Sequence, residues 1–441
     1  MKNRRALGWF LFGLGGDLQL VASLSITELF VFVAAPLLFL KEQPHMKRNG
    51  IMPFFYLSLA LVVGCVIACI VNHTPPTFVL RGMAVCCLMP CAIIVTHWML
   101  RNDMSGLKWS FVGGALSGVI CTFAFQKAVE VSIMGSSAEE IMGGATYWIN
   151  RLGRFVTIPS KGWYLSCPII YSIGAPLSLA VFSMLTSISG RGSAIRAIAS
   201  ATLVLIGGKK SWNIKNRICR NFWLIVVLGF VGAFAVKQTY QIAATSGWLG
   251  EKALDKYEMQ TKGKTGIMAL LLGGRMQSFC GLLACVDKPL VGFGPWAQDN
   301  AGYKAEFLSK YGDPTDYENY IRMVEHDNAL GIVRSHNLIP CHSVVTELWL
   351  WYGIFGLLFC LYMFYALLRY MREDCWVVPQ WYFWIGASVP GLFWDMCFNP
   401  LEGRVALPMI VVACLIVRAV RKGQMAMPKI MYEEILKSER H

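Results

Sequence analysis

The sequence has few charged residues, and this scarcity excludes most soluble folds. Only 15% of the residues are Asp, Glu, Lys or Arg, whereas 56% are hydrophobic and the mean hydropathy is +0.50. A typical soluble domain carries charge on about a quarter of its residues. Apolar runs of about 20 residues, the length that spans the hydrocarbon core of a bilayer, recur along the chain. The composition therefore predicts an all-α polytopic membrane protein.

Acidic residues are fewer than basic ones, 26 against 40, which gives a net charge of +14. A net positive charge of this size is compatible with nucleic-acid binding, so the positions of the basic residues are needed to decide whether nucleic acid is a partner. Lys and Arg gather in short connectors between apolar runs and in the C-terminal tail, at residues 41–48, 101–108, 209–220, 369–372 and 418–429. Short connectors rich in Lys and Arg face the cytoplasm. The pattern argues against a nucleic-acid partner and predicts that both termini are cytoplasmic.

The chain lacks a Cys-x-x-C pair, the usual signature of a thiolate metal site, and we predict neither a metal nor a cofactor. Most of its 15 cysteines lie in apolar runs, where they are expected to behave as small hydrophobic residues. Cys280, Cys285 and Cys341 instead flank a polar insertion, and the sequence leaves open whether two of them form a disulfide. The N-terminus, Met1–Arg5 followed by apolar residues, lacks an obvious cleavage site, so a retained first helix is expected.

Apolar segments separated by polar turns predict about 12 transmembrane helices. The apolar stretch 7–40 is interrupted at residues 15–17, so we expect two short or tilted helices there. The next two helices are expected at residues 54–71 and 79–100, joined by an outer turn at 72–76.

The middle of the chain has an odd number of clear apolar candidates. The connectors 101–108 and 209–220 both look cytoplasmic, so an even number of crossings must lie between them. We expect residues 163–189 to break into two short helices near Pro176, because an interior proline removes a hydrogen bond and kinks a helix. A weaker crossing within 133–150 is the alternative. The remaining crossings are expected at residues 222–236, 348–370, 381–395 and 407–420.

These segments divide the chain into N-terminal transmembrane helices (1–240), one large periplasmic loop (241–346), C-terminal transmembrane helices (347–420) and a cytoplasmic tail (421–441). The loop is the only long polar insertion, so chemistry at the membrane surface is expected there. Its residues 275–287 place apolar side chains at helical spacing, which predicts an amphipathic helix. A second, polar helix is expected to begin near Asp313 and to present Glu325, His326 and Asp327 as a solvated face rather than a metal site.

Two features of the loop suggest a site for an anionic substrate. Arg275 stands in the first turn of the predicted amphipathic helix, where free N–H groups and a guanidinium favour a phosphate or pyrophosphate. An arginine that reaches to lipid headgroups is an equally good interpretation. His336 and His342 close the loop, and an imidazole at the interface can take a proton from a sugar hydroxyl near neutral pH. The spacing alone does not choose between the two histidines.

Motifs in the loop and in the segments on either side of it occur in the same order as in the O-antigen ligase and polymerase family, which the chain therefore resembles. The members of this family are bacterial enzymes that transfer lipid-linked glycans. Residues 189–192 are similar to the family's Ser-Arg-Gly element, and Gly274-Arg275 opens the large loop as it does in the family. Residues 288–294 are similar to its Pro-Leu-x-Gly-x-Gly segment. His342-Ser343, followed by Gly-x-x-Gly at 353–356, resembles the ending of the family's loop.

The resemblance implies a GT-C-like membrane fold and metal-independent transfer of a glycan from an undecaprenyl-pyrophosphate carrier to an acceptor hydroxyl. It implies that His342 deprotonates the acceptor and that Arg275 neutralises the leaving pyrophosphate. Arg191 and Arg154 would be further pyrophosphate contacts. Arg404, in the outer turn 400–404, is another candidate contact, although an anchor to lipid headgroups is the favoured interpretation for it. The expected partners are the lipid-linked donor, a glycan or lipid A core acceptor, and the lipids of the bacterial inner membrane.

Four glycines belong to the motifs that carry the resemblance, and a structural role is expected for them: Gly292, Gly294, Gly353 and Gly356.

Two other functions remain open at this point. A polymerase of the same family would join repeat units on the carrier lipid, and the residues do not distinguish it from a ligase. A transporter of lipid-linked sugars would place ionisable groups deep in its helices and often shows inverted repeats. Asp17, Glu28 and Asp395 are candidates for such groups, but each can sit near a helix end, and no repeat is evident. An enzyme is favoured because the polar residues are concentrated in one loop.

Overall fold

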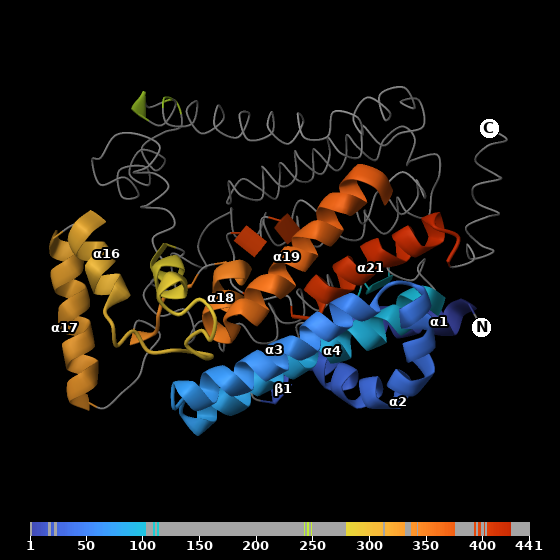
Figure 1. The fold of residues 1–441 in the computed structure, drawn as a ribbon, viewed down its shortest axis with the longest axis horizontal. Coiled ribbons are helices and arrows are strands. Elements are labelled where there is room, and N and C mark those ends of the chain that lie inside the picture. Colours follow the sequence, from blue (N-terminus) through green and yellow to red (C-terminus); the bar gives the residue numbers. More distant parts are fainter. Residues whose placement is uncertain are drawn as a thin grey trace.

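The structure is a computed structural model, and it is mostly helical in the part of the chain that it describes (Figure 1). The described residues are 2–15, 19–21, 24–102, 109–110, 113, 242, 245–246, 248, 279–311, 314–330, 337–341, 343–374, 392–393, 396–397, 401 and 404–424.

The N-terminal part begins with two helices joined by a small hairpin. Helix α1 spans Lys2–Leu14 and α2 spans Ile26–Arg48. Between them β1 (Gln19–Val21) pairs antiparallel with β2 (Leu24–Ser25). The expected pair of helices is confirmed. The sequence pattern does not predict the strands, because they are too short to show an alternation of apolar and polar residues.

Helix α2 starts at a capping box. The Ser25 hydroxyl accepts a hydrogen bond from the Glu28 backbone N–H at 3.2 Å, and the Glu28 carboxylate accepts one from the Ser25 N–H at 2.8 Å. This pairing satisfies two backbone donors that the first turn of a helix leaves free. Glu28 is therefore a residue of a helix end, as expected.

Helices α3 (Met52–Val71) and α4 (Pro76–Asn102) lie side by side and are joined by a short turn (Figure 1). Both are long and apolar enough to cross a membrane. The helices expected at 54–71 and 79–100 are thus confirmed, with α4 extended at both ends. Exposed aliphatic residues of α3 form a stripe at helical spacing: Leu59, Val63, Val66, Ile67 and Ile70. A stripe of this kind is suited to contact with lipid, and these helices indicate a membrane protein.

The prediction of a single helix over residues 348–370 is wrong. The chain instead forms α18 (Val344–Tyr352), breaks at Gly353, and continues as α19 (Ile354–Arg369) with a π-helical turn, η4 (Tyr370–Asp374). Residues Ile354–Asp374 together are the third described helix that could cross a membrane. The break occurs because Gly353 has a φ of +58°, which a residue with a Cβ adopts only under strain.

The polar loop contains two helices, α16 (Tyr303–Tyr311) and α17 (Pro314–Leu330), at the same end of the molecule as the turn between α3 and α4 (Figure 1). The polar helix expected to begin near residue 313 is confirmed. The prediction that this helix has a solvated face is confirmed only in part, because Glu325 and His326 are exposed but Asp327 is buried. The amphipathic helix expected over residues 275–287 is helical over 279–287, the portion that the structure describes.

The core of the described part is built around α4, which packs against α2, α3 and the C-terminal helix α21 (Ala406–Arg421). Helix α19 packs against α3 and α21. The helix expected at residues 407–420 is confirmed as α21. The crossings expected between residues 109 and 236 and at 381–395 lie outside the described residues, apart from isolated positions. The four-part division of the chain stays a prediction.

Candidate functional site

The loop of residues 288–296 fills the break between α18 and α19. In a continuous helix the Ile354 N–H would donate to the Leu350 carbonyl. Here the Ile354 N–H donates to the Leu290 carbonyl at 3.0 Å, and the Leu350 carbonyl accepts from the Phe293 N–H at 2.6 Å. The loop therefore supplies a partner to each of the two backbone groups that the break exposes.

Glycines make this close contact possible. An added Cβ on Gly353 would overlap the Leu290 carbonyl oxygen, and one on Gly292 would lie 2.6 Å from the Leu350 oxygen and 2.7 Å from the Gly353 nitrogen. Gly292 also has a positive φ, +76°. Backbone meets backbone at both positions, so no side-chain movement could make room for a larger residue. A third glycine, Gly356, would overlap the Leu348 carbonyl in the same way.

The loop also reaches down between the helices. Gly294 leaves room for the Thr74 hydroxyl, 2.8 Å from where its Cβ would be, and the Pro295 ring packs on Gly82 of α4. Gly82 is six residues after the first residue of α4, about 9 Å along the helix axis. The loop therefore contacts α4 as well as the break between α18 and α19.

Side chains tie the loop to the end of α3. The Asn72 amide donates to the Gly292 carbonyl at 3.1 Å, and its oxygen accepts from Lys288 Nζ at 2.7 Å. On the other side of the loop, Trp349 Nε1 of α18 donates to the Pro289 carbonyl at 3.0 Å. The ends of α3 and α18 are thus joined through one segment.

Ser343 fixes the start of α18. Its hydroxyl accepts from the Thr346 N–H at 3.2 Å and donates to the Met396 carbonyl at 3.1 Å. The first of these bonds is an N-cap, which satisfies a free donor of the first turn. The start of a helix carries a partial positive charge, so this end of α18 favours an anion nearby.

The turn before α18 packs against the helical residues 279–287. Gly281 leaves room for the Cys341 sulfur, 2.9 Å from where its Cβ would be, and Cys285 donates to the Thr346 carbonyl at 3.5 Å. Cys280, Cys285 and Cys341 are free thiols. Burial raises the pKa of Cys280 and of Cys285 to about 12 and that of Cys341 above its usual value, so the thiol form is favoured.

The start of α18 is also joined to the segment after residue 400. Glu347 accepts from the Leu401 N–H at 2.8 Å. Arg404 lies 3.9 Å from Glu28 of α2, at the limit of an ion pair, and its side chain is partly exposed. The contact leaves donors of the guanidinium available, so the expected pyrophosphate contact of Arg404 stays a prediction.

The other charged residues expected at the site, Arg154, Arg191, Arg275 and His342, lie outside the described residues, as does His336. The structure describes the residues on either side of 342 and the four motif glycines. It brings together the glycine motifs 292–294 and 353–356, which are far apart in the sequence.

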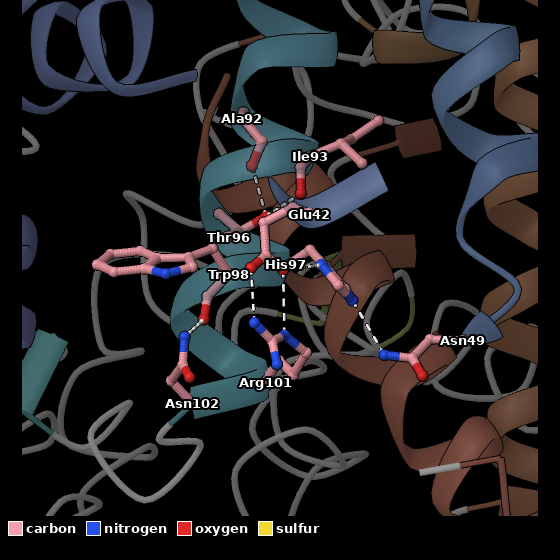
Figure 2. Close-up of polar contacts among 9 residues, drawn as sticks. All are labelled: Glu42, Asn49, Ala92, Ile93, Thr96, His97, Trp98, Arg101 and Asn102. Atoms are coloured by element: carbon pink, nitrogen blue, oxygen red, sulfur yellow. Dashed lines mark hydrogen bonds and ion pairs between the residues drawn. The ribbon is translucent and has the colours of Figure 1, made fainter. Parts of the chain in front are cut away.

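The best-defined buried polar cluster of the described part lies at the other end of α4 and is absent from the residues singled out by sequence (Figure 2). Arg101 binds both oxygens of Glu42, at 2.6 and 3.1 Å, and His97 Nδ1 lies 3.1 Å from Glu42 Oε2. The Asn49 amide nitrogen is 3.0 Å from His97 Nε2. Because an amide nitrogen only donates, Nε2 accepts in this orientation and the imidazole proton faces Glu42.

Burial raises the pKa of Glu42, but the hydrogen bonds from His97 and Arg101 and the Arg101 charge outweigh it and lower the pKa to about 2. Glu42 is therefore ionised and clamps α2 to α4. A sequence signal for this cluster exists, because His97 interrupts an apolar run, and an ionisable residue in such a run generally has a partner.

No family model matches the chain, and no curated protein matches it either. Among the described residues, no group of three or more His, Cys, Asp or Glu side chains has an arrangement that could hold a metal ion.

Proposed function

We propose that this chain is a glycosyltransferase of the O-antigen ligase type, which moves a glycan from undecaprenyl pyrophosphate to an acceptor hydroxyl. The observation that carries the proposal is the insertion of residues 288–296 into the break between α18 and α19. It joins two glycine motifs of the resemblance into one backbone structure at one end of the bundle. A loop and a helix that fit together through backbone contacts alone make a rigid support for a site.

The rigid support also brings together segments next to the two proposed catalytic residues: the residue before His342 and the helical residues 279–287, which follow Arg275. Gly281 contacts Cys341, the residue before His342. Arg275 precedes the described helical residues 279–287 by four positions, a length of chain that spans at most about 14 Å. We therefore expect Arg275 to lie within reach of a diphosphate whose sugar is near His342.

In the proposed reaction, His342 takes the proton of the acceptor hydroxyl as the oxygen attacks the first carbon of the glycan. The bond from that carbon to the pyrophosphate oxygen breaks, and undecaprenyl pyrophosphate leaves with the electron pair. Arg275 would neutralise the growing charge, assisted by Arg191, Arg154 and Arg404. The start of α18, capped by Ser343, directly follows His342 in the sequence and would add a partial positive charge.

The occupied helix break is evidence against a transporter. Transporters use the free backbone groups of broken helices to bind substrate groups and ions. In this chain the Phe293 N–H and the Leu290 carbonyl already occupy the corresponding groups of Leu350 and Ile354. The break is therefore built to hold a loop.

The proposal includes a GT-C-like bundle of about 12 helices in the bacterial inner membrane, with both termini in the cytoplasm. The turn between α3 and α4, the inserted loop, α16 and α17 lie at one end of the molecule (Figure 1) and would face the periplasm. The Glu42 cluster at the other end of α4 would then be near the cytoplasmic surface (Figure 2). Lys41, Lys47 and Arg48 in the same connector agree with this orientation.

The test is a transfer assay with purified protein in proteoliposomes, an undecaprenyl-pyrophosphate-linked glycan, and lipid A core or free glycan as acceptor. The release of undecaprenyl pyrophosphate and the transfer of glycan are both measured over time, and their rates are compared. His342→Ala should lower the rate by about 10²–10⁴-fold, the usual contribution of a general base. Arg275→Ala should lose about 10²-fold or more, as other groups that stabilise a developing charge do.

His336→Ala is the matched control, because it removes an imidazole from the same loop and should retain most activity. Full activity of His342→Ala or Arg275→Ala would reject the role proposed for that residue. If His336→Ala lost as much activity as His342→Ala, the base would be wrongly assigned. Which of the two acceptors, lipid A core or glycan, supports transfer then distinguishes a ligase from a polymerase.

A further inference from the structure

The helical residues 279–287 have apolar side chains on both of their faces. One face is buried against the protein and includes Cys280, Ala284 and Cys285. The other face and the turn that follows remain exposed and, apart from Asp287 and Lys288, are apolar. The large apolar residues exposed there are Leu282 at 43%, Leu283 at 45%, Val286 at 62% and Leu290 at 66%. A helix that faces water on its outer side would carry polar residues there.

This exposed surface, Leu282, Leu283, Val286 and Leu290, adjoins the end of a helix that could cross the membrane. The residue Asn72, which follows α3, bonds to Lys288 and to the Gly292 carbonyl on either side of Leu290. The last residues of α3, Ile70 and Val71, are themselves exposed and apolar. The apolar surface of α3 and that of the loop are therefore neighbours at one level along the bundle.

The polar residues around this surface are those found at a membrane–water boundary. Lys288 is exposed and follows the helix directly. Its Nζ donates to Asn72 Oδ1 at 2.7 Å and lies 4.6 Å from the centre of the Phe293 ring, and the remaining donors of the ammonium are available to a lipid phosphate. Trp349 binds the Pro289 carbonyl and has an indole of the kind that gathers at membrane interfaces. An acidic neighbour, Asp287, accepts a hydrogen bond from the Tyr303 hydroxyl at 2.7 Å.

The geometry points to an interfacial anchor: residues 279–290 lie in the outer leaflet of the membrane, with Leu282, Leu283, Val286 and Leu290 among the acyl chains and Lys288 at the phosphates. The partner is a phospholipid surface rather than another protein, because the patch adjoins the exposed apolar end of α3, a helix that could cross a membrane. This anchor does not depend on glycan transfer. It would hold the polar loop against the membrane whether or not the chain is an enzyme.

The experiment places a photo-crosslinking amino acid, benzoylphenylalanine, at single positions of the full-length protein in nanodiscs. The nanodiscs contain phosphatidylethanolamine and phosphatidylglycerol with an alkyne-tagged portion of either lipid. After irradiation, a fluorophore is attached to the tag and the protein band is read in a gel. The test positions are Leu283 and Val286. Val63, exposed on α3, is the lipid-facing control, and Glu318, exposed on the polar helix α17, is the water-facing control.

Leu283 and Val286 should label with lipid as strongly as Val63, and Glu318 should not label. Weak labelling at both test positions, with strong labelling at Val63, would overturn the anchor. Cross-links from Leu283 to a second copy of the chain, without lipid labelling, would overturn it as well, since the patch would then be a protein interface. Labelling at Leu283 should favour tagged phosphatidylglycerol and lose this preference in Lys288→Gln; an unchanged preference would remove Lys288 from the anchor.

Discussion

Replacing Gly353 by alanine tests whether the helix break and the loop form one unit. The added methyl group would meet the Leu290 oxygen and would lie 2.6 Å from the Val291 carbonyl carbon, both of them backbone atoms. The loop would have to withdraw from α18, because no rotamer change could relieve the contact. Withdrawal breaks the Ile354–Leu290 and Leu350–Phe293 hydrogen bonds.

The cost follows from two contributions. A residue with a Cβ held at the backbone angles of Gly353, φ +58° and ψ −141°, costs about 1–3 kcal/mol. Each buried backbone group left without a partner costs about 1–3 kcal/mol, and withdrawal leaves two such groups at the break, the Leu350 carbonyl and the Ile354 N–H. We expect Gly353→Ala to lower the free energy of unfolding by about 3–9 kcal/mol, the sum of these contributions, and to lower the transfer rate because the turn that carries His342 loses its support.

Gly423→Ala is the matched control. Gly423 also has a positive φ, +68°, but nothing lies within 4 Å of where its Cβ would be, so this variant should bear the backbone strain alone. Thermal unfolding in detergent is followed with a thiol-reactive dye, because Cys280, Cys285 and Cys360 are buried until the chain unfolds. If Gly353→Ala unfolds at the same temperature as Gly423→Ala, the loop does not fill the break and the reasoning is refuted.

Three further substitutions test other contacts by the same unfolding assay or by exchange. Glu42→Gln should cost up to about 3 kcal/mol at neutral pH, because the pKa of Glu42 falls from 4.5 to about 2 on folding. That contribution to the free energy of unfolding is present above pH 4.5 and is lost as the pH falls towards 2. The difference in stability between Glu42→Gln and the wild type should therefore narrow over this range. A difference that stays constant would contradict the role of the Glu42 charge. Ser343→Ala should cost about 1–2 kcal/mol through loss of the helix cap, and Ser343→Thr should recover most of it; equal losses would refute the cap. Asp299→Ala should speed hydrogen exchange in α16, because the Asp299 carboxylate accepts from the N–H groups of Tyr303 and Lys304, and unchanged exchange would show that these bonds contribute little.

The parts of the fold that follow from local pattern could be predicted from the sequence. Helices α3 and α4 were expected within a few residues of their ends, because long apolar runs meet at a turn rich in polar residues and proline. The start of α17 follows from a proline at its first position, where the missing N–H costs nothing. These signals lie within one segment and need no knowledge of the rest of the chain.

The parts that depend on distant partners could not be predicted. The apolar pattern runs through Gly353 without interruption, and only the Leu290 carbonyl and the Phe293 N–H make a break there favourable. The clamp between Glu42 and Arg101 joins residues of two helices, and the sequence pattern assigned them only to charged connectors. The same holds for Asp327, which looks solvated by its neighbours in sequence but is buried in the fold.

The most direct measurement of the central claim is a cryo-EM structure of the full chain in nanodiscs with an undecaprenyl-pyrophosphate-linked glycan bound. We expect density for the diphosphate beside Arg275, at the end of the bundle that holds the inserted loop, with His342 facing the first sugar. Donor density at the opposite end of α4, or Arg275 and His342 too far apart to contact one donor, would contradict it.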